Sequence, residues 1–376
     1  MLRHTFTAVV AASLALGSTA LVAPAASSVE KTNKLIIAVE APLTGDLASL
    51  GTDMLRSVRM AADQVNAQGG VNGQMVKIVA IDDKGDPAFA LSSVKKAKKA
   101  KAKAVIGIYN SSIGVINLSE YLKAKIVPLH MTSSNDTDGE GVTLNPKNDQ
   151  IAPVEFDYVS GLGVKSVAML VDPSTYTQGM ADRLKNSLQG QGVTVTEIAV
   201  PEGTNDLTSE VTQAIATGAD LIYSSTYYPE GSQIATILSA SNSSAKCLMG
   251  LANVDPAFVT QAGVAASQRC SFSGIPAASQ MPGAKAAKFV KQYERKYKKT
   301  PGVWGIFTYD EAKLLFETME KTGKSSFAAN LNSLKKTKNY KGASGVTTIN
   351  KKTGNREVVP VYILTVDNNG NYQVQK

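Results

Sequence analysis

Short apolar runs alternate with longer amphipathic segments along most of this chain. The first run, KLIIAVE at 34–40, predicts a buried strand, and apolar residues at helical spacing over 51–68 predict a helix that ends at Gly69-Gly70. Further strands are predicted at 75–81, 104–109 and 126–129, with helices beginning at Asp86-Pro87 and over 113–122 between them. Strands separated by helices of this length form parallel sheets that are covered on both faces.

A second series repeats this order after residue 150. Helices are predicted at 151–160, 178–188, 207–216 and 230–239, and strands at 166–171, 194–200, 221–225, 246–250 and 270–274. The pattern therefore predicts an α/β chain of two doubly wound, Rossmann-like lobes in tandem.

The pattern changes after Pro282. Helices are predicted at 284–297, 309–322 and 326–335, followed by a β-hairpin of strands 345–350 and 358–366 joined by the polar turn KKTGNRE. Because no strand is predicted between 281 and 338, these helices have to pack on sheets already built. The chain is therefore expected to visit its lobes more than once.

The first residues have the composition of an export signal. Arg3 precedes an apolar run over 6–21, and small residues follow at Ala23, Ala25 and Ala26. Polar and small residues interrupt the run, which suits a signal segment better than a membrane-spanning helix. We expect residues 1–26 to be a signal peptide, with no Cys after them for a lipid anchor, and the mature protein to be periplasmic or extracellular.

Composition excludes several classes of function. The 376 residues are 43% hydrophobic and 19% charged, with a net charge of +8, as in an ordinary globular protein. Six lysines cluster at 95, 96, 98, 99, 101 and 103, but no aromatic residue or Arg is interleaved with them. This favours a solvated helix face over a nucleic-acid contact.

Catalytic chemistry is poorly supplied. Of two histidines, His4 lies in the expected signal segment, which leaves His130. No GxGxxG follows the first strand, and neither a P-loop nor a GxSxG motif occurs. We therefore expect a protein that is not an enzyme and that carries no cofactor and no catalytic metal.

Cys247 and Cys270 are the two cysteines of the chain. An even pair in an exported protein favours a disulfide, and two separate buried thiols are the alternative. Closing a loop of this length stabilises a fold by about 3 kcal/mol in the chain-entropy model.

Hydroxyl-bearing residues follow two neighbouring strands. Ser111 and Ser112 come after AVIGIYN, and Thr132, Ser133 and Ser134 come after the next strand. Ligands of doubly wound sheets bind at the carboxyl ends of the strands, and hydroxyls with free N–H groups at a helix start suit a carboxylate. A plain helix cap is the alternative role for such a serine.

Several longer segments together carry a family resemblance. They are APLTGDLASLG, AADQVNAQGGVNGQMVKIVAIDDKGDP, IGIYNSS, LIYSSTYYPEGSQ and WGIFTYDEAKLLFETMEKTG. In these segments the chain resembles the type I periplasmic solute-binding proteins of ABC transporters, in the leucine/isoleucine/valine-binding branch. The resemblance implies two lobes that close on a small ligand, joined by three crossings, with 31–150 plus 280–344 in the N-terminal lobe and 151–279 plus 345–376 in the C-terminal lobe.

The same resemblance implies roles for individual residues. Ser111 and the turn Thr132–Ser134 match positions that hold the ligand carboxylate, and Tyr176 and Tyr227 match tyrosines that cover the ligand on closure. Asp149 matches a position that balances a ligand ammonium. Half-buried rings near the hinge, and a helix cap at Asp149, are the alternatives that need no ligand.

Two departures from the family pattern leave the ligand open. Amino-acid binders carry a Glu after the strand that here reads KCLMG, and Ala252 or Asn253 stands at that position; Leu50 replaces an aromatic residue of the side-chain pocket. The ligand is therefore either a branched-chain or other amino acid, with Asn253 among its contacts, or a solute such as an amide, urea or an aromatic carboxylate. The expected partner is a membrane permease, and an extracellular sensor is the alternative role.

Overall fold

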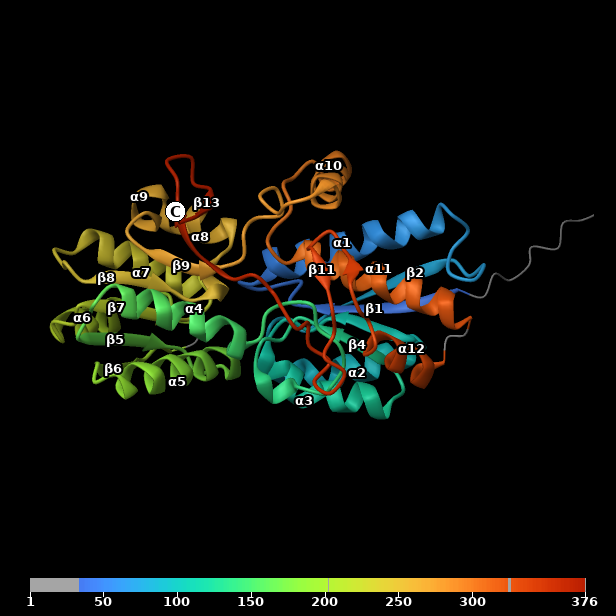
Figure 1. The fold of residues 1–376 in the computed structure, drawn as a ribbon, viewed down its shortest axis with the longest axis horizontal. Helices are drawn as coiled ribbons and strands as arrows, with labels where there is room; N and C mark the ends of the chain where they lie inside the picture. Colours follow the sequence, from blue (N-terminus) through green and yellow to red (C-terminus); the bar gives the residue numbers. More distant parts are fainter. Residues whose placement is uncertain (1–33, 202, 324–325, 376) are drawn as a thin grey trace, which may run out of the picture. The chain divides into compact units, whose positions relative to one another are not determined.

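The computed structural model describes residues 34–201, 203–323 and 326–375. The expected signal peptide lies outside the described residues. Within them, no helix has both the length and the apolar character needed to cross a membrane. Two large sheets, one parallel and one mostly parallel, organise the described part of the chain, and each is covered by helices on both faces (Figure 1).

The first sheet has the strand order β2-β1-β3-β4, with every pairing parallel. Alternate residues of β1 face opposite ways, so that Ile37 and Val39 pack toward one helix layer and Ala38 toward the other. The elements are β1 (Leu35–Ala41), α1 (Ala48–Asn66), β2 (Val76–Asp82), α2 (Ala90–Lys99), β3 (Ala104–Gly107), α3 (Ser111–Lys123) and β4 (Val127–His130).

The second sheet has the order β13-β12-β9-β8-β7-β5-β6. Its five strands from β5 to β9 are parallel, and β12 and β13 add an antiparallel edge. The strands are β5 (Ser166–Val171), β6 (Thr194–Ala199), β7 (Leu221–Ser225), β8 (Lys246–Met249), β9 (Ser271–Gly274), β12 (Tyr362–Val366) and β13 (Tyr372–Val374). The helices are α4 (Asn148–Gly161), α5 (Thr175–Gly190), α6 (Thr208–Ala216), α7 (Tyr228–Ala240), α8 (Pro256–Ala262) and α9 (Val264–Ser267).

The later helices return to the first sheet. They are α10 (Ala284–Tyr297), α11 (Gly305–Thr322) and α12 (Phe327–Leu334). Helix α11 packs along α1, and α10 is tied to α1 by the hydrogen bond from the Tyr297 hydroxyl to the Arg56 carbonyl, at 2.7 Å. The chain therefore passes between the two sheets three times, as the family resemblance implies.

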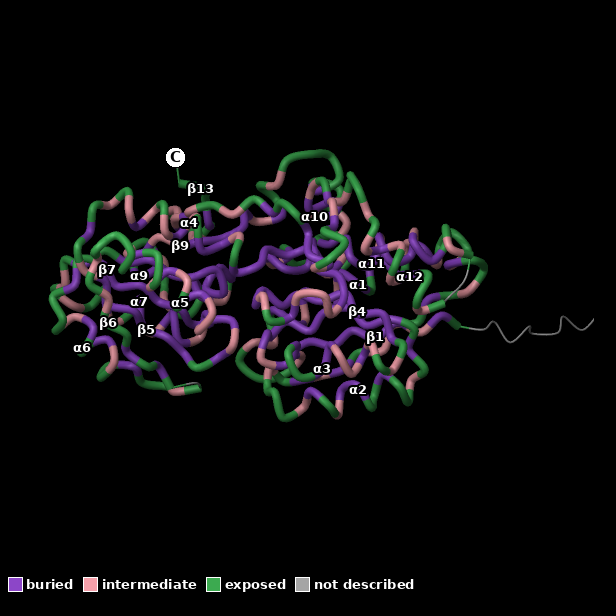
Figure 2. Tube along the Cα trace, turned by 60° about the horizontal axis from the view of Figure 1, so that its bottom comes forward, coloured by how far each residue is buried: buried purple, intermediate pink, exposed green. Residues whose placement is uncertain are grey.

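The burial pattern follows the layers (Figure 2), with the central strands buried and the edge strands β6 and β13 and the outer helix faces largely exposed. All six clustered lysines of α2 and the turn after it are exposed, whereas Ala90, Val94 and Ala97 of the same helix are buried. This arrangement is that of a solvated helix face.

Cys247 and Cys270 form a disulfide, with their Cα atoms 4.5 Å apart. Cys247 lies in β8, and Cys270 directly precedes β9, the neighbouring strand. The expected bond is confirmed, and it links two adjacent parallel strands of the second sheet.

The predicted C-terminal hairpin is wrong in its pairing. Strand β11 (Val346–Thr347) pairs with β10 (Tyr340–Lys341), whereas β12 pairs with β9 and β13. The first expected strand makes one bridge, from Ile349 to Arg356, which lies in the expected turn. Pro360 explains the break, because it has no N–H to donate to a ladder and interrupts the run that was expected to continue into 366.

Residues 345–357 bond to the segment that follows β4 rather than to the second sheet. The Thr143 amide donates to the Gly354 carbonyl at 3.0 Å, and the Arg356 amide donates to the Thr143 carbonyl at 2.9 Å. The Lys335 ammonium donates to the Gly139 carbonyl at 2.8 Å in the same region. The last segment of the chain thus joins the second sheet at β12.

Candidate ligand-binding site

The carboxyl ends of β3 and β4 bring the two hydroxyl-rich turns together. Because these strands pair in parallel, the residues that follow them meet at one edge, and the Ser134 amide donates to the Ser111 hydroxyl at 3.2 Å. The chain turns sharply after β3, where Gly107 has φ +112 and Ile108 has φ 56. A positive φ is costly for a β-branched residue and is characteristic of functional turns.

A small cavity lies between this edge and the second sheet. On the side of the first sheet, the lining includes residues from the turns after β3 and β4. On the side of the second sheet, the lining residues come from the starts of α5 and α7 and from the loop after β8. The lining residues are Tyr109, Ser111, Met131, Ser133, Tyr176, Tyr227, Leu251, Ala252 and Trp304. Its volume is about 10 Å³, which is room for about one water molecule.

Aromatic rings fill most of the space around the cavity. The Tyr109 ring lies between Trp304, at 5.6 Å, and Tyr227, at 6.1 Å, measured between ring centroids. The Tyr176 ring packs on the other side of Tyr227 at 6.1 Å. Trp304 is the one tryptophan of the chain. The cavity therefore has rigid aromatic walls and two serine hydroxyls.

No charged residue lines this cavity, but two buried carboxylates lie behind its wall. Glu155 accepts hydrogen bonds from the Tyr223 hydroxyl at 2.9 Å and the Ser273 hydroxyl at 2.5 Å, and burial raises its pKa to about 7. Burial also raises the pKa of Asp255 to about 7.

Tyr109 and Tyr176 stay protonated. Burial, and next the neighbouring Tyr227, raises the pKa of Tyr109, and burial followed by the field of Glu155 raises the pKa of Tyr176. Each hydroxyl can therefore donate a hydrogen bond to a ligand oxygen.

Four of the predicted site residues lie on the cavity, namely Ser111, Ser133, Tyr176 and Tyr227. Ser112 instead reaches the second lobe's helix α5, where it accepts from the Thr175 amide at 3.0 Å and bonds to the Thr175 hydroxyl at 3.2 Å. Thr132 and Ser134 hold the turn itself. The Thr132 hydroxyl bonds to His130 Nδ1 at 2.8 Å, and the Ser134 hydroxyl caps a short helical turn at Asp136.

Asp149 does not reach the cavity. Its side chain is exposed in the first turn of α4, and its backbone amide donates to Asn135 Oδ1 at 3.2 Å. The helix begins earlier than predicted, with Lys147 at the N-cap position, so Asp149 is not the cap either. Its carboxylate is placed to interact with the positive end of the helix dipole.

Asn253 is buried behind the cavity wall rather than on it. Its side-chain amide donates to the Thr226 carbonyl at 3.0 Å and the Gly250 carbonyl at 3.1 Å. The residue before it, Ala252, lines the cavity. Asn253 therefore positions the loop after β8 against the end of β7.

Sequence reasoning missed the remaining wall residues, of which Tyr109 and Trp304 are the largest. Both stand inside the quoted family segments, and Tyr109 is two residues before Ser111 at a strand end. An aromatic residue at that place was a usable signal. The buried Lys147 was also missed: its ammonium donates to the carbonyls of Ser134, at 2.5 Å, and Thr132, at 3.3 Å, and so fixes the turn from beneath.

Polar contacts join the two lobes beside the cavity. The Tyr228 hydroxyl donates to the Asp46 carbonyl and bonds to the Ser49 hydroxyl at 3.2 Å. On another side, the Arg183 guanidinium donates to Asn135 Oδ1 at 3.0 Å. These bonds link α7 and α5 to the loops after β1 and β4.

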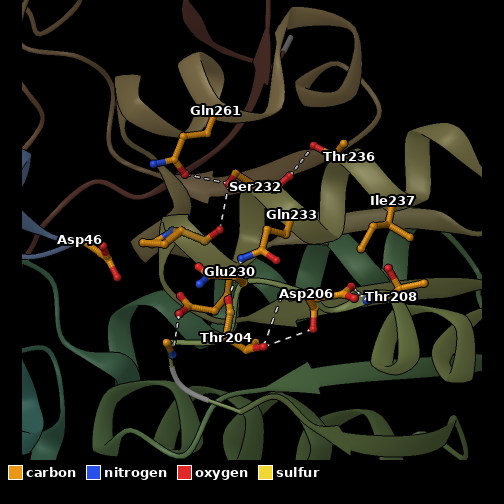
Figure 3. A pocket seen from close by; sticks show the side chains of 13 residues that line it. Asp46, Thr204, Asp206, Thr208, Glu230, Ser232, Gln233, Thr236, Ile237 and Gln261 are labelled. Atoms are coloured by element: carbon orange, nitrogen blue, oxygen red, sulfur yellow. Dashed lines mark hydrogen bonds between the residues drawn. The ribbon is translucent and has the colours of Figure 1, made fainter.

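A larger polar cavity of about 470 Å³ lies next to Tyr228 (Figure 3). Asp46 approaches it from the first lobe, and α7, α8 and the loop at 203–208 form the rest. Its side chains bond mainly to backbone groups of the same lining, as in the 2.9 Å bond from Gln233 to the Thr204 carbonyl, and the Ser232 hydroxyl donates to Gln261 Oε1 at 2.9 Å. The described residues hold no His, Cys, Asp and Glu cluster of three or more that could bind a metal ion. The aromatic cavity is therefore the better candidate.

A family model described as periplasmic binding protein matches residues 34–371. The chain belongs to the periplasmic binding protein family. Within this family the likeness to the type I, leucine/isoleucine/valine-binding branch is confirmed, and the protein is a solute-binding protein of the ABC-transporter type.

Relatives show how far the likeness extends. An amino acid binding protein of Pseudomonas aeruginosa is 33% identical over 204 residues, which are 52% of this chain and 54% of that protein. This alignment thus spans about half the length of the curated relative.

Solved structures share the fold over nearly the whole chain. A leucine binding protein, LivK, from Thermotoga maritima matches with a TM-score of 0.83 at 23% identity, covering 91% of this chain and 98% of its own. A solute binding protein of an ABC transporter from R. palustris, in complex with benzoate, matches with a TM-score of 0.80 at 18% identity, covering 91% and 95%. Neighbours of one fold thus hold different ligands, and the fold alone does not select one.

Proposed function

We propose that this periplasmic binding protein is the extracytoplasmic solute-binding component of an ABC importer, and that its ligand is a small carboxylate held in the aromatic cavity. The observation that carries the proposal is the cavity lining itself: residues of both lobes meet there, with the Ser111 and Ser133 hydroxyls on one side and tyrosine hydroxyls on the other. A carboxylate needs hydrogen-bond donors of this kind, and the cavity offers them without a competing acid.

The cavity of about 10 Å³ admits about one water molecule, so the lobes have to stand further apart than in this structure to admit a carboxylate and to close on it. We assign 34–147 and about 283–359 to one lobe and 148–275 and 361–375 to the other, with the boundary of the last crossing moved to β12. A ligand between the lobes contacts both only when they are shut, so binding shifts the population toward the closed form. The partner that recognises the closed form is a membrane permease.

An amino acid is the second candidate, supported by the relative from Pseudomonas aeruginosa. Its ammonium would need a partner, yet the uncharged Ala252 or Asn253 stands at the position of the expected Glu, and Asp149 is exposed at the start of α4. A ligand without an ammonium therefore fits this lining better. Such ligands include 2-oxo acids and other small carboxylates.

Catalysis is not part of the proposal. His130 is buried, bonds to Thr132 and does not line the cavity. Because burial lowers its pKa well below the usual value, the imidazole stays neutral. A sensor role uses the same closure, and a gene neighbourhood that encodes a permease and ATPases would favour transport.

Trp304 gives a direct test, because the one tryptophan of the chain lies in the cavity wall. The mature protein, unfolded and refolded to remove ligand, is titrated with leucine, its 2-oxo acid, alanine, pyruvate, small amides and benzoate while the tryptophan emission is followed. We expect a saturable change with carboxylates that lack an amine.

Thermal unfolding provides the second readout, since a ligand at 100 times its Kd stabilises by about 2.7 kcal/mol. Binding of leucine without binding of its 2-oxo acid would replace the carboxylate proposal with the amino-acid one. A panel without any response in either readout would contradict both.

A further inference from the structure

A third cavity, of about 440 Å³, lies where the chain passes between the lobes. Its walls come from both later connecting segments, 275–282 between β9 and α10 and 356–362 leading into β12, together with residues near β11 and Phe307 of α11. It shares no lining residue with the aromatic cavity. We call it the hinge cavity. Its size is in the range of small-molecule sites.

The hinge cavity gathers exposed apolar side chains. Of the eight large apolar residues that are exposed in the described part of the chain, three line this cavity: Val346 at 56%, Val358 at 73% and Tyr362 at 39%. Ile275, Met281 and Phe307 extend the apolar wall inward. Single exposed apolar residues are ordinary, but several around one concave surface indicate a binding site.

A buried cation stands at one end of this cavity. Arg356 lines it, yet the residue is only 3% exposed. The guanidinium donates to the Val346 carbonyl at 2.9 Å and the Ser344 carbonyl at 3.2 Å, while its Nε has no hydrogen-bond partner among the described residues.

The charge of Arg356 is not neutralised by an ion pair within the described residues. Asp310 is the carboxylate whose charge acts on Arg356 and favours its protonated form. It already accepts hydrogen bonds from the amides of Ala343 and Ser344 and from the Ser344 hydroxyl. The guanidinium also donates to the Ser344 hydroxyl at 3.4 Å, and that hydroxyl separates it from Asp310. Among the described residues, Arg356 therefore has no direct contact with a carboxylate, and an anionic ligand would supply one.

We propose that the hinge cavity binds a small apolar carboxylate, such as a medium-chain fatty acid, with its carboxylate toward Arg356 and its apolar part against Val346, Val358 and Tyr362. The guanidinium can turn from its carbonyl partners toward a carboxylate, which it holds through paired N–H groups. Glu357, exposed on the rim, disfavours the reverse orientation.

Occupancy of the hinge cavity would act on closure. Its walls belong to two segments that must change direction when the lobes move, so a bound molecule favours the lobe arrangement in which those walls fit it. By linkage, a molecule that alters closure also alters the affinity of the aromatic cavity, and the reverse coupling has the same size. The binding part of the proposal stands without the proposed function, because the sites are separate.

The test compares octanoate, octanol and octylamine by isothermal titration calorimetry on the mature protein. We expect octanoate to bind at one site per chain and at least tenfold more tightly than octanol, with octylamine weakest. Val358→Asp should weaken octanoate binding at least tenfold, because it places a charge on the apolar wall. Leu91→Asp is the matched control, since Leu91 is 52% exposed on α2 and lies outside this cavity.

Arg356→Gln should remove the preference for octanoate over octanol, and Arg356→Lys should retain part of it. Thermal unfolding shows whether the two Arg356 variants are folded. If they are not, Val358→Asp still tests the site, because Val358 is exposed and its substitution leaves the fold intact. Equal binding of octanoate and octanol would overturn the carboxylate assignment. A concentration-dependent dimer in sedimentation, abolished by Val358→Asp while octanoate does not bind, would make the surface a contact between two copies and overturn the ligand site.

Discussion

Tyr109 decides how much room a ligand has. Its ring occupies the space between Trp304 and Tyr227, and the cavity that remains is about 10 Å³. We predict that Tyr109→Leu enlarges the cavity and raises affinity for leucine-sized carboxylates at least tenfold relative to pyruvate. The loss of ring packing should cost about 2 to 4 kcal/mol of stability.

Titration followed by the emission of Trp304 measures the change, and thermal unfolding measures the stability. Tyr121→Leu is a matched loss of a buried tyrosine ring away from the cavity, on α3. If Tyr109→Leu leaves the order of ligand affinities unchanged, the ring does not set ligand size.

Ser111 and Asp149 separate the two candidate ligands. Removal of the Ser111 hydroxyl takes away a donor on the cavity and also an acceptor for the Ser134 amide. We predict that Ser111→Ala lowers carboxylate affinity about tenfold, or about 1.4 kcal/mol, whereas Asp149→Asn changes the affinity for leucine and for its 2-oxo acid less than twofold. Calorimetric titration checks both, and a large loss of leucine affinity alone in Asp149→Asn would restore the ammonium-binding role that its sequence position suggests.

For single residues, the sequence predicts which types of side chain lie at the site better than it predicts where each side chain points. Hydroxyls after β3 and β4 were foreseeable because ligands bind at such edges, and Ser111 and Ser133 do line the cavity. Thr132 and Ser134 have the same chemistry and the same neighbours in sequence, but their hydroxyls bond within the turn. Sequence spacing does not say which hydroxyl points outward, because that depends on the kink at Gly107 and Ile108 and on Lys147 beneath.

Helix α4 is joined to the second sheet by a buried carboxylate, Glu155, which holds Tyr223 of β7 and Ser273 of β9. Its folded pKa of about 7 lies above the ordinary value of 4.5, so the folded state binds more protons than the unfolded state between these values. The stabilisation is complete below pH 4.5 and is lost as the pH rises through 7.

We predict that Glu155→Gln, which keeps the hydrogen-bonding shape without the charge, reduces the fall in unfolding free energy between pH 5 and pH 8. Urea unfolding at the two pH values measures it, with the surface variant Glu120→Gln as the control. Identical pH slopes in the wild type and Glu155→Gln would show that Glu155 does not titrate in this interval.

The disulfide gives a separate prediction for the strands β8 and β9. Replacing both Cys247 and Cys270 by alanine removes the cross-link between them, and the loss should lower the unfolding free energy by about 3 kcal/mol. Urea unfolding of the double variant, compared with the oxidised wild type, checks this. A change below about 0.5 kcal/mol would show that the disulfide does not stabilise the fold by restricting the unfolded chain, and that strand pairing alone holds β8 and β9 together.

Most elements follow from local periodicity, and the exceptions depend on distant contacts. Helix α11 was expected from 309 but begins at Gly305, whose amide donates to Asp53 Oδ2 of α1 at 2.6 Å. The C-terminal hairpin was expected from two apolar runs and a polar turn. Its strands pair with different partners because Pro360 interrupts one run and residues 353–356 bond to the segment at 139–143. Nothing near these residues in sequence signals either contact.

For the whole molecule, the alternation of strands and helices sufficed to predict two doubly wound lobes, and the returning helices indicated that the chain crosses more than once. The crossings themselves were implied by the family resemblance rather than by periodicity. Neither periodicity nor the family resemblance predicts how the two lobes are placed against each other, because this depends on single contacts such as that of Tyr228 with Asp46 and Ser49.

That contact is where closure can be altered without touching the ligand. Tyr228 does not line the aromatic cavity, and its hydroxyl bonds across to the first lobe only when the lobes are together. We predict that Tyr228→Phe shifts the unliganded population toward the open form and lowers ligand affinity about three- to tenfold, since about 1 kcal/mol of hydrogen bonding is lost from one state alone.

Small-angle scattering measures the radius of gyration with and without ligand, and calorimetry measures the affinity. Saturating ligand should return the variant to the wild-type radius, because binding energy compensates for the missing bond. Tyr297→Phe, which loses a bond to Arg56 inside one lobe, should leave both quantities unchanged. An unchanged affinity in Tyr228→Phe would mean that the hydroxyl is equally well bonded in the open form and that closure is controlled elsewhere.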